Sequence, residues 1–260
     1  FLGVITVLLV AEPNQSETKP ATLASEQRVI DFLARSKLKP GRLRDTRAWL
    51  IGAIVCPFVD FFQRNGRFAI VILLFISVFR LSDIAMGVMA NPFYLDMGYT
   101  KLEIANIAKF FGFFMTIAGS LICGLLVVKW GILKPLLIGA VAVATTNLLF
   151  AVLSTLEPEL TWLAIVISAD NISGGFAATA FIAYLSSLTN KAYTATQYAL
   201  FSSLMTLPGK VISGFSGIVV DAEGYLTFFI IAAGLGLPAI ILVLILMRKR
   251  DLMDLDVGKS

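Results

Sequence analysis

The chain has 260 residues, of which 58% are hydrophobic and 15% are charged, and its formal net charge is +4. Soluble domains average about 45–50% apolar and about 25% charged residues, so this composition excludes an ordinary water-soluble domain. There is no histidine, and Cys56 and Cys123 lie in separate apolar runs without CxxC spacing. The sequence therefore supports neither a disulfide framework nor a metal site, and no cofactor is expected.

The chain opens in the middle of an apolar run, residues 1–11, which we expect to be the tail of an earlier transmembrane helix. On this interpretation the sequence is the C-terminal part of a longer protein, and its partner is the N-terminal half of that protein. Residues 12–66 are then a connecting loop. Its part 12–47 is polar and basic, and its part 49–62 is apolar but too short to span, so we expect an interfacial helix there.

Six longer apolar runs follow, over 67–94, 101–128, 134–154, 160–189, 195–220 and 225–247. Each can cross roughly 30 Å of hydrocarbon at about 1.5 Å per residue. The loops between them are short, so consecutive helices must be antiparallel. Thr100 and Glu103 have the spacing of a capping box at the start of the second run. The predicted fold class is an all-α integral membrane protein.

Basic residues separate cleanly between the two sets of loops, and this separation predicts orientation rather than binding to nucleic acid. One set contains the basic linker, and the other is acidic, with Lys101 as its exception. By the positive-inside rule, the connecting loop and the tail, residues 248–260, are cytoplasmic. The basic set also includes Lys129, Lys134, Lys191, Arg248, Lys249 and Arg250.

Five charged residues lie inside the predicted spans: Arg80, Asp83, Lys109, Asp170 and Lys210. At about 2.5–3.5 kcal/mol each near the bilayer centre, five lipid-facing charges would cost about 12–17 kcal/mol. That is as large as the net stability of a typical domain, about 5–15 kcal/mol. We therefore expect these residues to be paired or to face a watery cavity, and they are candidate functional residues.

The charges repeat between the first three spans and the last three. Each set has an acid in its first helix, a lysine in its second and no charge in its third. This pattern is typical of two inverted three-helix repeats with a site at the repeat interface. It predicts that the first, second, fourth and fifth spans line the site and that the third and sixth face lipid.

Each of these charges also has a structural interpretation. Arg80 and Asp83 are i,i+3 neighbours and could neutralise each other, and Lys109 could extend toward the membrane surface. Asp170 and the adjacent Asn171 form a polar cluster that suits substrate or proton handling. Because histidine is absent, buried carboxylates are the groups expected to titrate near neutral pH, so Asp83 and Asp170 are the candidates for proton coupling. Arg80, Lys109 and Lys210 would supply counter-charge or bind a carboxylate, with Asn171.

Two backbone features are candidate hinges. Gly174 and Gly175 follow Asp170 by one turn, and Pro208 and Gly209 precede Lys210. Irregular backbone at membrane depth is tolerated where it lines a cavity or packs on protein. The alternative interpretation is close helix packing through small residues.

Several stretches resemble the AmpG-like permeases of the major facilitator superfamily. They are PFVDFFQRNG (57–66), FRLSDIAMG (79–87), GYTKLEIANIAKFFG (98–112) and the long segment DNISGGFAATAFIAYLSSLTNKAYTATQYALFSS (170–203). The turn Lys129-Trp130-Gly131 after Gly124 resembles the loop signature of the superfamily, with Val128 in place of the usual acid. At Arg80 the family often has lysine, and at Asp170 often glutamate.

The resemblance implies a fold of two six-helix halves, of which this chain is the tail of helix 6, the central loop and the C-terminal six-helix half, residues 67–247. It implies a transporter in the bacterial inner membrane, not an enzyme. The implied activity is proton-driven uptake of N-acetylglucosaminyl-anhydro-N-acetylmuramic acid, with or without its peptide. Two alternatives remain open: another substrate in the same fold (acetyl-CoA, a siderophore or a sugar), and a non-transporting scaffold or sensor.

Overall fold

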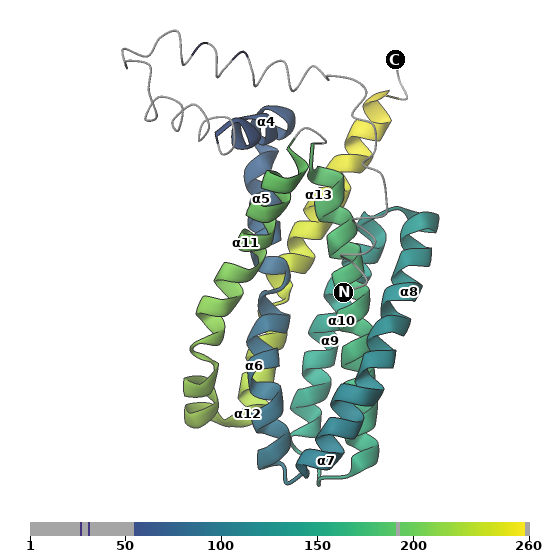
Figure 1. The fold of residues 1–260 in the computed structure, drawn as a ribbon, viewed down its shortest axis with the longest axis vertical. Coiled ribbons are helices and arrows are strands. Elements are labelled where there is room, and N and C mark those ends of the chain that lie inside the picture. The colour runs from purple at the N-terminus through teal and green to yellow at the C-terminus, as the bar shows by residue number, and fades with distance from the viewer. Residues whose placement is uncertain (1–26, 28–30, 32–54, 191–192, 258–260) are drawn as a thin grey trace, which may run out of the picture. The chain divides into compact units, whose positions relative to one another are not determined.

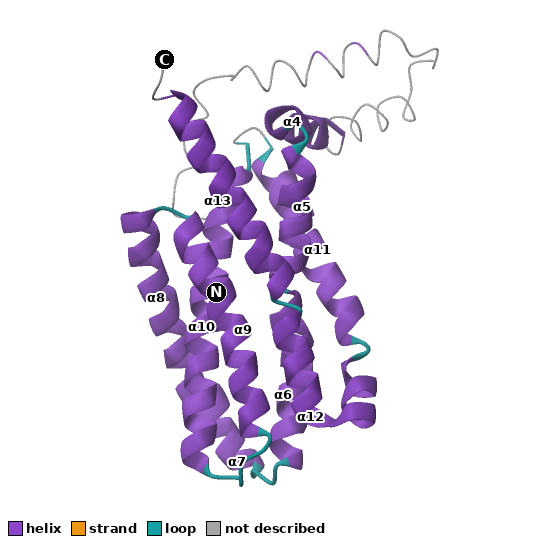
Figure 2. Cartoon of the chain, turned by 180° about the vertical axis from the view of Figure 1, so that it is seen from behind, coloured by secondary structure: helices purple, strands orange, loops and turns teal. Residues whose placement is uncertain are grey.

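The computed structural model describes residues 27, 31, 55–190 and 193–257, and every regular element among them is a helix (Figures 1 and 2). The predicted helix tail at 1–11 and nearly all of the predicted linker at 12–47 lie outside these residues. The contacts divide the chain into two units, residues 1–64 with 190–196, and residues 65–189 with 197–260.

The described helix of the first unit is α4, Cys56–Asn65. It overlaps the interfacial helix predicted near 49–62, but it ends later, and residues 49–54 lie outside the described chain. Asp60 joins α4 to Asn190 within this unit. Its carboxylate accepts hydrogen bonds from the Arg64 guanidinium at 3.0 Å and from the Asn190 side-chain amide at 3.1 Å. Its placement flat on a membrane stays a prediction.

Five helical segments of the described chain are long and apolar enough to cross a membrane. The first consists of α5, Phe68–Phe79, and α6, Leu81–Asp96. The second consists of α7, Lys101–Ile104, the π-helix η2, Ala105–Phe111, and α8, Gly112–Trp130. The third is α9, Leu133–Leu153, and the fourth is α10, Leu160–Leu188. The fifth joins α12, Ser216–Gly234, to α13, Leu237–Val257.

The predicted span 195–220 differs most from the structure. Its helix α11, Thr194–Ser213, contains too many polar residues to count among the five apolar segments. Helix α11 ends at Ser213, and the next helix, α12, begins at Ser216. Helix α12 is itself interrupted at Gly224 (φ 78°, ψ 172°). This positive φ favours glycine, and it lies between the two predicted spans, 195–220 and 225–247. The last helix also continues beyond the predicted end at 247, to Val257.

Helix α9 lies at the centre of the second unit. It packs most closely against α10, α12 and α13. In its most apolar stretch 50% of the residues are buried, whereas in that of the second segment 17% are buried. The third span, expected to face lipid, therefore has much of its surface covered by protein. Helices α8 and α11 lie on opposite flanks of the bundle in both views (Figures 1 and 2).

Two local features explain how the helices are fixed. Phe93 of α6 contacts Phe229 of α12 and Phe150 of α9, with ring centroids 4.9 and 6.3 Å apart, so one aromatic cluster joins three helices. The predicted capping box is confirmed at the start of α7. The Thr100 hydroxyl accepts from the Glu103 amide at 3.3 Å, and the Glu103 carboxylate accepts from the Thr100 amide at 2.8 Å.

Candidate functional site

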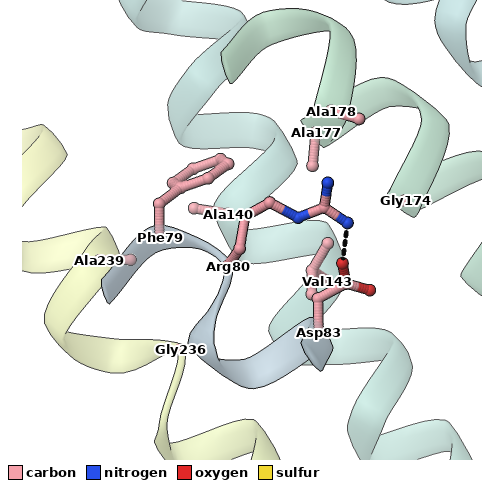
Figure 3. A pocket seen from close by; sticks show the side chains of 10 residues that line it. All are labelled: Phe79, Arg80, Asp83, Ala140, Val143, Gly174, Ala177, Ala178, Gly236 and Ala239. Carbon is pink, nitrogen blue, oxygen red and sulfur yellow. Dashed lines mark hydrogen bonds and ion pairs between the residues drawn. The ribbon is translucent and has the colours of Figure 1, made fainter. Parts of the chain in front are cut away.

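The first span is broken at Arg80, between α5 and α6. Arg80 has φ −96° and ψ 6°, which ends one helix and starts the next. The last span is broken at a corresponding place, between Gly234 and Leu237. The two breaks lie side by side, because Arg80 and Gly236 line one small cavity (Figure 3) and the Ser82 hydroxyl donates to the Ala232 carbonyl at 2.6 Å. Sequence reasoning did not predict either break.

Arg80 and Asp83 form an ion pair at this break. The Arg80 guanidinium donates to the Asp83 carboxylate, as Figure 3 shows, and the two side chains are 34% and 30% exposed. The predicted i,i+3 pairing is therefore confirmed. Asp83 lies in the first turn of α6, where the positive end of the helix dipole favours a negative charge.

Asp170 lies partly buried on α10, and the structure brings it near Asp83. The two carboxylates are close enough to interact electrostatically, and Tyr94 of α6 is also within electrostatic range of Asp170. Thr146 of α9 approaches the Asp170 carboxylate with its hydroxyl at 3.5 Å. The acids of the first and fourth spans, chosen from the sequence as a pair of candidates, thus belong to one region of the bundle.

Asn147 is a polar residue of this region that sequence reasoning missed. It is completely buried on α9, and its amide donates to the Ser82 hydroxyl at 2.7 Å. Because that hydroxyl gives its own proton to the Ala232 carbonyl, the Asn147 side chain has to present its NH₂ group there. Its Oδ1 then finds no donor among the described residues. The sequence did contain a signal for it, because an asparagine inside an otherwise uncharged apolar span needs hydrogen-bond partners and therefore indicates a polar contact with another helix.

Asn171 joins two helices rather than lining the cavity. Its Oδ1 accepts from the Thr116 hydroxyl at 3.0 Å, and its amide donates to the Ile167 carbonyl at 2.8 Å. It also fills the space beside Gly112, where an added Cβ would lie 2.9 Å from its Nδ2. Its role in substrate binding stays a prediction.

Lys109 and Lys210 are not brought to the Arg80–Asp83 pair. Both are exposed, Lys109 on η2 and Lys210 on α11, and neither forms a salt bridge with another described residue. Lys109 lies on a π-helical segment, a rare form that is frequent at functional sites. The sequence did not predict that segment.

The predicted hinge residues lie within continuous helices. Gly175 of α10 packs against α8, because an added Cβ would lie 2.2 Å from the Thr116 carbonyl oxygen, whereas Gly174 has nothing within 4 Å. Pro208 and Gly209 lie inside α11, and Gly209 faces the Ile84 side chain. The structure gives Gly175 and Gly209 packing roles, and hinge motion at either pair stays a prediction.

The cavity beside Arg80 and Asp83 has a free volume of about 10 Å³. That is about the space one water molecule needs, so it is too small for a sugar. Within the described residues no group of three potential metal ligands occurs. Two carboxylates, an arginine and several hydroxyls can hold and transfer a proton, and they lie at the depth where two spans are broken.

Comparison with known proteins identifies the class. The sequence profile of the Major Facilitator Superfamily matches residues 1–211. The chain is 39% identical over 202 residues to "Putative transporter AmpG 4" of Rickettsia felis, which covers 78% of this chain and 48% of that protein. It is 31% identical over 194 residues to "Anhydromuropeptide permease" of Escherichia coli K12, covering 74% of this chain and 39% of that protein.

The chain thus spans less than half the length of these curated relatives. Its helical fold and its apolar segments agree with the family, and they confirm the fold class predicted from the sequence. The chain belongs to the Major Facilitator Superfamily, and its apolar helices are those of a multi-pass membrane protein.

Proposed function

We propose that this chain forms the C-terminal half of a proton-coupled transporter that imports cell-wall turnover products from the periplasm to the cytoplasm. The substrate class is N-acetylglucosaminyl-anhydro-N-acetylmuramic acid, with or without its peptide. Similarity to an anhydromuropeptide permease supports this class. The connecting loop and the C-terminal tail are cytoplasmic in this proposal, and the membrane is the bacterial inner membrane.

The observation that carries the proposal is the approach of Asp170 to Asp83. Gly174, one turn after Asp170 on α10, lines the same small cavity as Arg80 and Asp83, and the two carboxylates are within electrostatic range of each other. Asp83 is paired with Arg80. When Asp170 gains a proton, the repulsion between the two carboxylates is relieved, while Asp83 keeps its pair with Arg80. Protonation thereby changes the forces between α6 and α10, which is what coupling proton entry to helix movement requires.

The substrate chamber in this proposal lies between this chain and the N-terminal half. Lys109 on η2 and Lys210 on α11 are both exposed in this half. An unpaired lysine facing lipid near the bilayer centre would cost about 2.5–3.5 kcal/mol. Contact with the other half, or with a watery chamber, removes that cost and leaves both cations available to the carboxylates of the substrate.

Replacement of Asp170 by asparagine in the full-length protein tests the coupling role. Proton-driven uptake of labelled anhydromuropeptide into vesicles should fall at least tenfold, while substrate exchange without a proton gradient should persist. Asp221→Asn, at an exposed carboxylate outside this region, is the matched control and should change neither. Unchanged uptake by Asp170→Asn, or loss of uptake and exchange together, would remove Asp170 from a coupling role.

A competition assay tests the substrate class. Unlabelled anhydromuropeptide should compete with its labelled form, and acetyl-CoA, a siderophore or a free sugar should not. Competition by one of these other solutes at lower concentration would replace the muropeptide with that solute.

A further inference from the structure

An open groove lies between α6 and the start of the second span, away from the Arg80–Asp83 cavity. Its volume is about 280 Å³, close to the lower end of the range typical of ligand sites, about 300–1,000 Å³. Leu95 and Ile104 supply an apolar floor. Asn91, Lys101 and Lys109 supply the polar groups, and Ala105 completes the lining.

The π-helix places both lysines on the same side. Lys101 and Lys109 are eight residues apart, and an α-helix that advances about 100° per residue would leave them about 80° apart. Through η2, Ala105–Phe111, the wider i→i+5 turns advance the chain by only about 80° per residue. That difference returns Lys109 to the face of Lys101 and Ala105, and all three line the groove.

The groove is positively charged and open. Asn91, Lys101 and Lys109 are exposed, and neither lysine forms a salt bridge with the rest of the chain that the structure describes. The alkyl part of each lysine can lie along apolar surface while its ammonium group stays free. Such a site attracts a ligand that carries more than one negative charge.

The distance between Lys101 and Lys109 along the helix can be compared with the length of a candidate ligand. Along the helix axis, the backbone positions of Lys101 and Lys109 are at most about 12 Å apart, the value for eight α-helical residues at about 1.5 Å each. An extended peptide of three residues spans about 10 Å at about 3.3–3.6 Å per residue. A phospholipid headgroup concentrates its charge at one phosphate, whereas a peptide stem carries carboxylates that are spaced along its length.

We propose that this groove binds the peptide stem of the transported muropeptide, with Lys101 and Lys109 pairing with its carboxylates and Asn91 hydrogen-bonding its backbone. The inference rests on the proposed function for the identity of the solute. The groove is a subsite for the peptide, separate from the part of the protein that holds the sugars. It explains how one transporter can accept sugars with a peptide attached.

The transport test uses the full-length protein with Lys101→Gln and Lys109→Gln together. The KM for the peptide-bearing substrate should rise at least tenfold more than the KM for the peptide-free disaccharide. Lys129→Gln, at an exposed lysine in the last turn of α8, at the opposite end of the second span from the groove, should leave the ratio of the two KM values unchanged. An unchanged ratio in the double variant would overturn the proposal.

A binding test separates failure of the groove from failure of the proposed function. Purified full-length protein in nanodiscs is labelled with an amine-reactive reagent, and modification of Lys101, Lys109 and Lys129 is quantified by mass spectrometry. The peptide-bearing muropeptide should reduce labelling of the first two at least threefold and leave Lys129 unchanged. Protection without transport would support the groove while refuting the proposed function.

The same experiment distinguishes a lipid from a solute. Nanodiscs of zwitterionic phosphatidylcholine and nanodiscs containing anionic phosphatidylglycerol should give equal labelling of Lys101 and Lys109 when no solute is present. Protection by the anionic lipid alone, with no further effect of the muropeptide, would assign the groove to a headgroup and overturn the proposal. Absence of protection under both conditions would overturn it as well.

Discussion

The contact between α8 and α10 makes a sharp prediction about two adjacent glycines. A Cβ added at Gly175 would lie 2.2 Å from the Thr116 carbonyl oxygen, and one added at Gly174 would meet nothing within 4 Å. The contact is reciprocal, because a Cβ at Gly119 would lie 2.1 Å from the Ile172 carbonyl oxygen. The two backbones therefore touch, and Gly175→Ala should force the helices apart while Gly174→Ala should not.

The size of the effect follows from the distance. Ordinary contact with a Cβ begins at 3.4 Å, so the Thr116 backbone has to withdraw from the new methyl group by about 1 Å, and overpacking of this kind costs about 1–3 kcal/mol. The obstacle is backbone rather than a flexible side chain, so local relaxation is limited. Gly174→Ala should be neutral or stabilise α10 by up to about 1 kcal/mol, because alanine favours the helix.

Cys123 provides a local reporter for this separation. Its side chain is completely buried on α8, and its thiol contacts the Ala180 backbone of α10. The rate of maleimide labelling at Cys123, followed by mass spectrometry on the full-length protein, should rise about 5- to 150-fold in Gly175→Ala, the range that about 1–3 kcal/mol gives. The apparent melting temperature should fall in the same variant.

The control decides between packing and hinge motion. If the glycine pair acts mainly as a flexible hinge, both substitutions should slow transport to a similar degree, and neither should expose Cys123. Equal labelling rates in Gly174→Ala, Gly175→Ala and the unchanged protein would refute the packing argument.

Three further predictions concern the broken spans and α11. Ser82→Ala removes the hydroxyl that links α9 to α12 and should destabilise the protein by about 1–3 kcal/mol, which would appear as a lower melting temperature. Ser82→Thr keeps a hydroxyl and should lose less stability than Ser82→Ala. Arg80→Gln and Asp83→Asn should each reduce stability, and the double variant should lose less than the sum of the two; additive losses would mean that the pair contributes no coupling energy. Gly209→Ala should destabilise the protein by about 1–3 kcal/mol, because the added Cβ would lie 2.7 Å from Cδ1 and 3.0 Å from Cβ of Ile84, and a β-branched side chain has little freedom to withdraw; slowed uptake without lost stability would favour a hinge there instead.

The apolar runs were sufficient to predict the fold class and the limits of some of the helices. Length and hydropathy depend on composition alone, so the limits of α9 and α10 lie within a few residues of the predicted spans 134–154 and 160–189. The Arg80–Asp83 pair was also predictable, because i,i+3 neighbours on one helix meet wherever the helix lies. Local rules of this kind need no knowledge of the remaining chain.

The breaks in the helices were not predictable by the same rules. Arg80 is neither proline nor glycine, yet the helix ends there, and two residues later the Ser82 hydroxyl bonds to the Ala232 carbonyl of α12, 150 residues away in the sequence. Pro208 and the Gly174–Gly175 pair carry the usual signals of a break, yet α11 and α10 continue through them. Tertiary hydrogen bonds and packing outweighed local preference in each case, and a single sequence contains no record of them.

The third span shows a similar limit. It has no charge, so the pattern of charges predicted a lipid-facing helix, but it packs against five helices of the described chain and supplies both Asn147 and Thr146 to the polar region. Uncharged polar side chains are inexpensive enough to occur in any span, and only the structure shows which of them meet acidic residues.

The adjacent breaks at Arg80 and Gly236 divide the first and last spans into two tiers. In one tier α5 contacts α13, and in the other α6 contacts α12, so each half-helix has a half-helix of the other span as its neighbour. The Ser82–Ala232 hydrogen bond joins the spans at the boundary between the tiers. A bend in either span at this level therefore carries the other with it, and one end of the bundle can tilt while the opposite end keeps its packing.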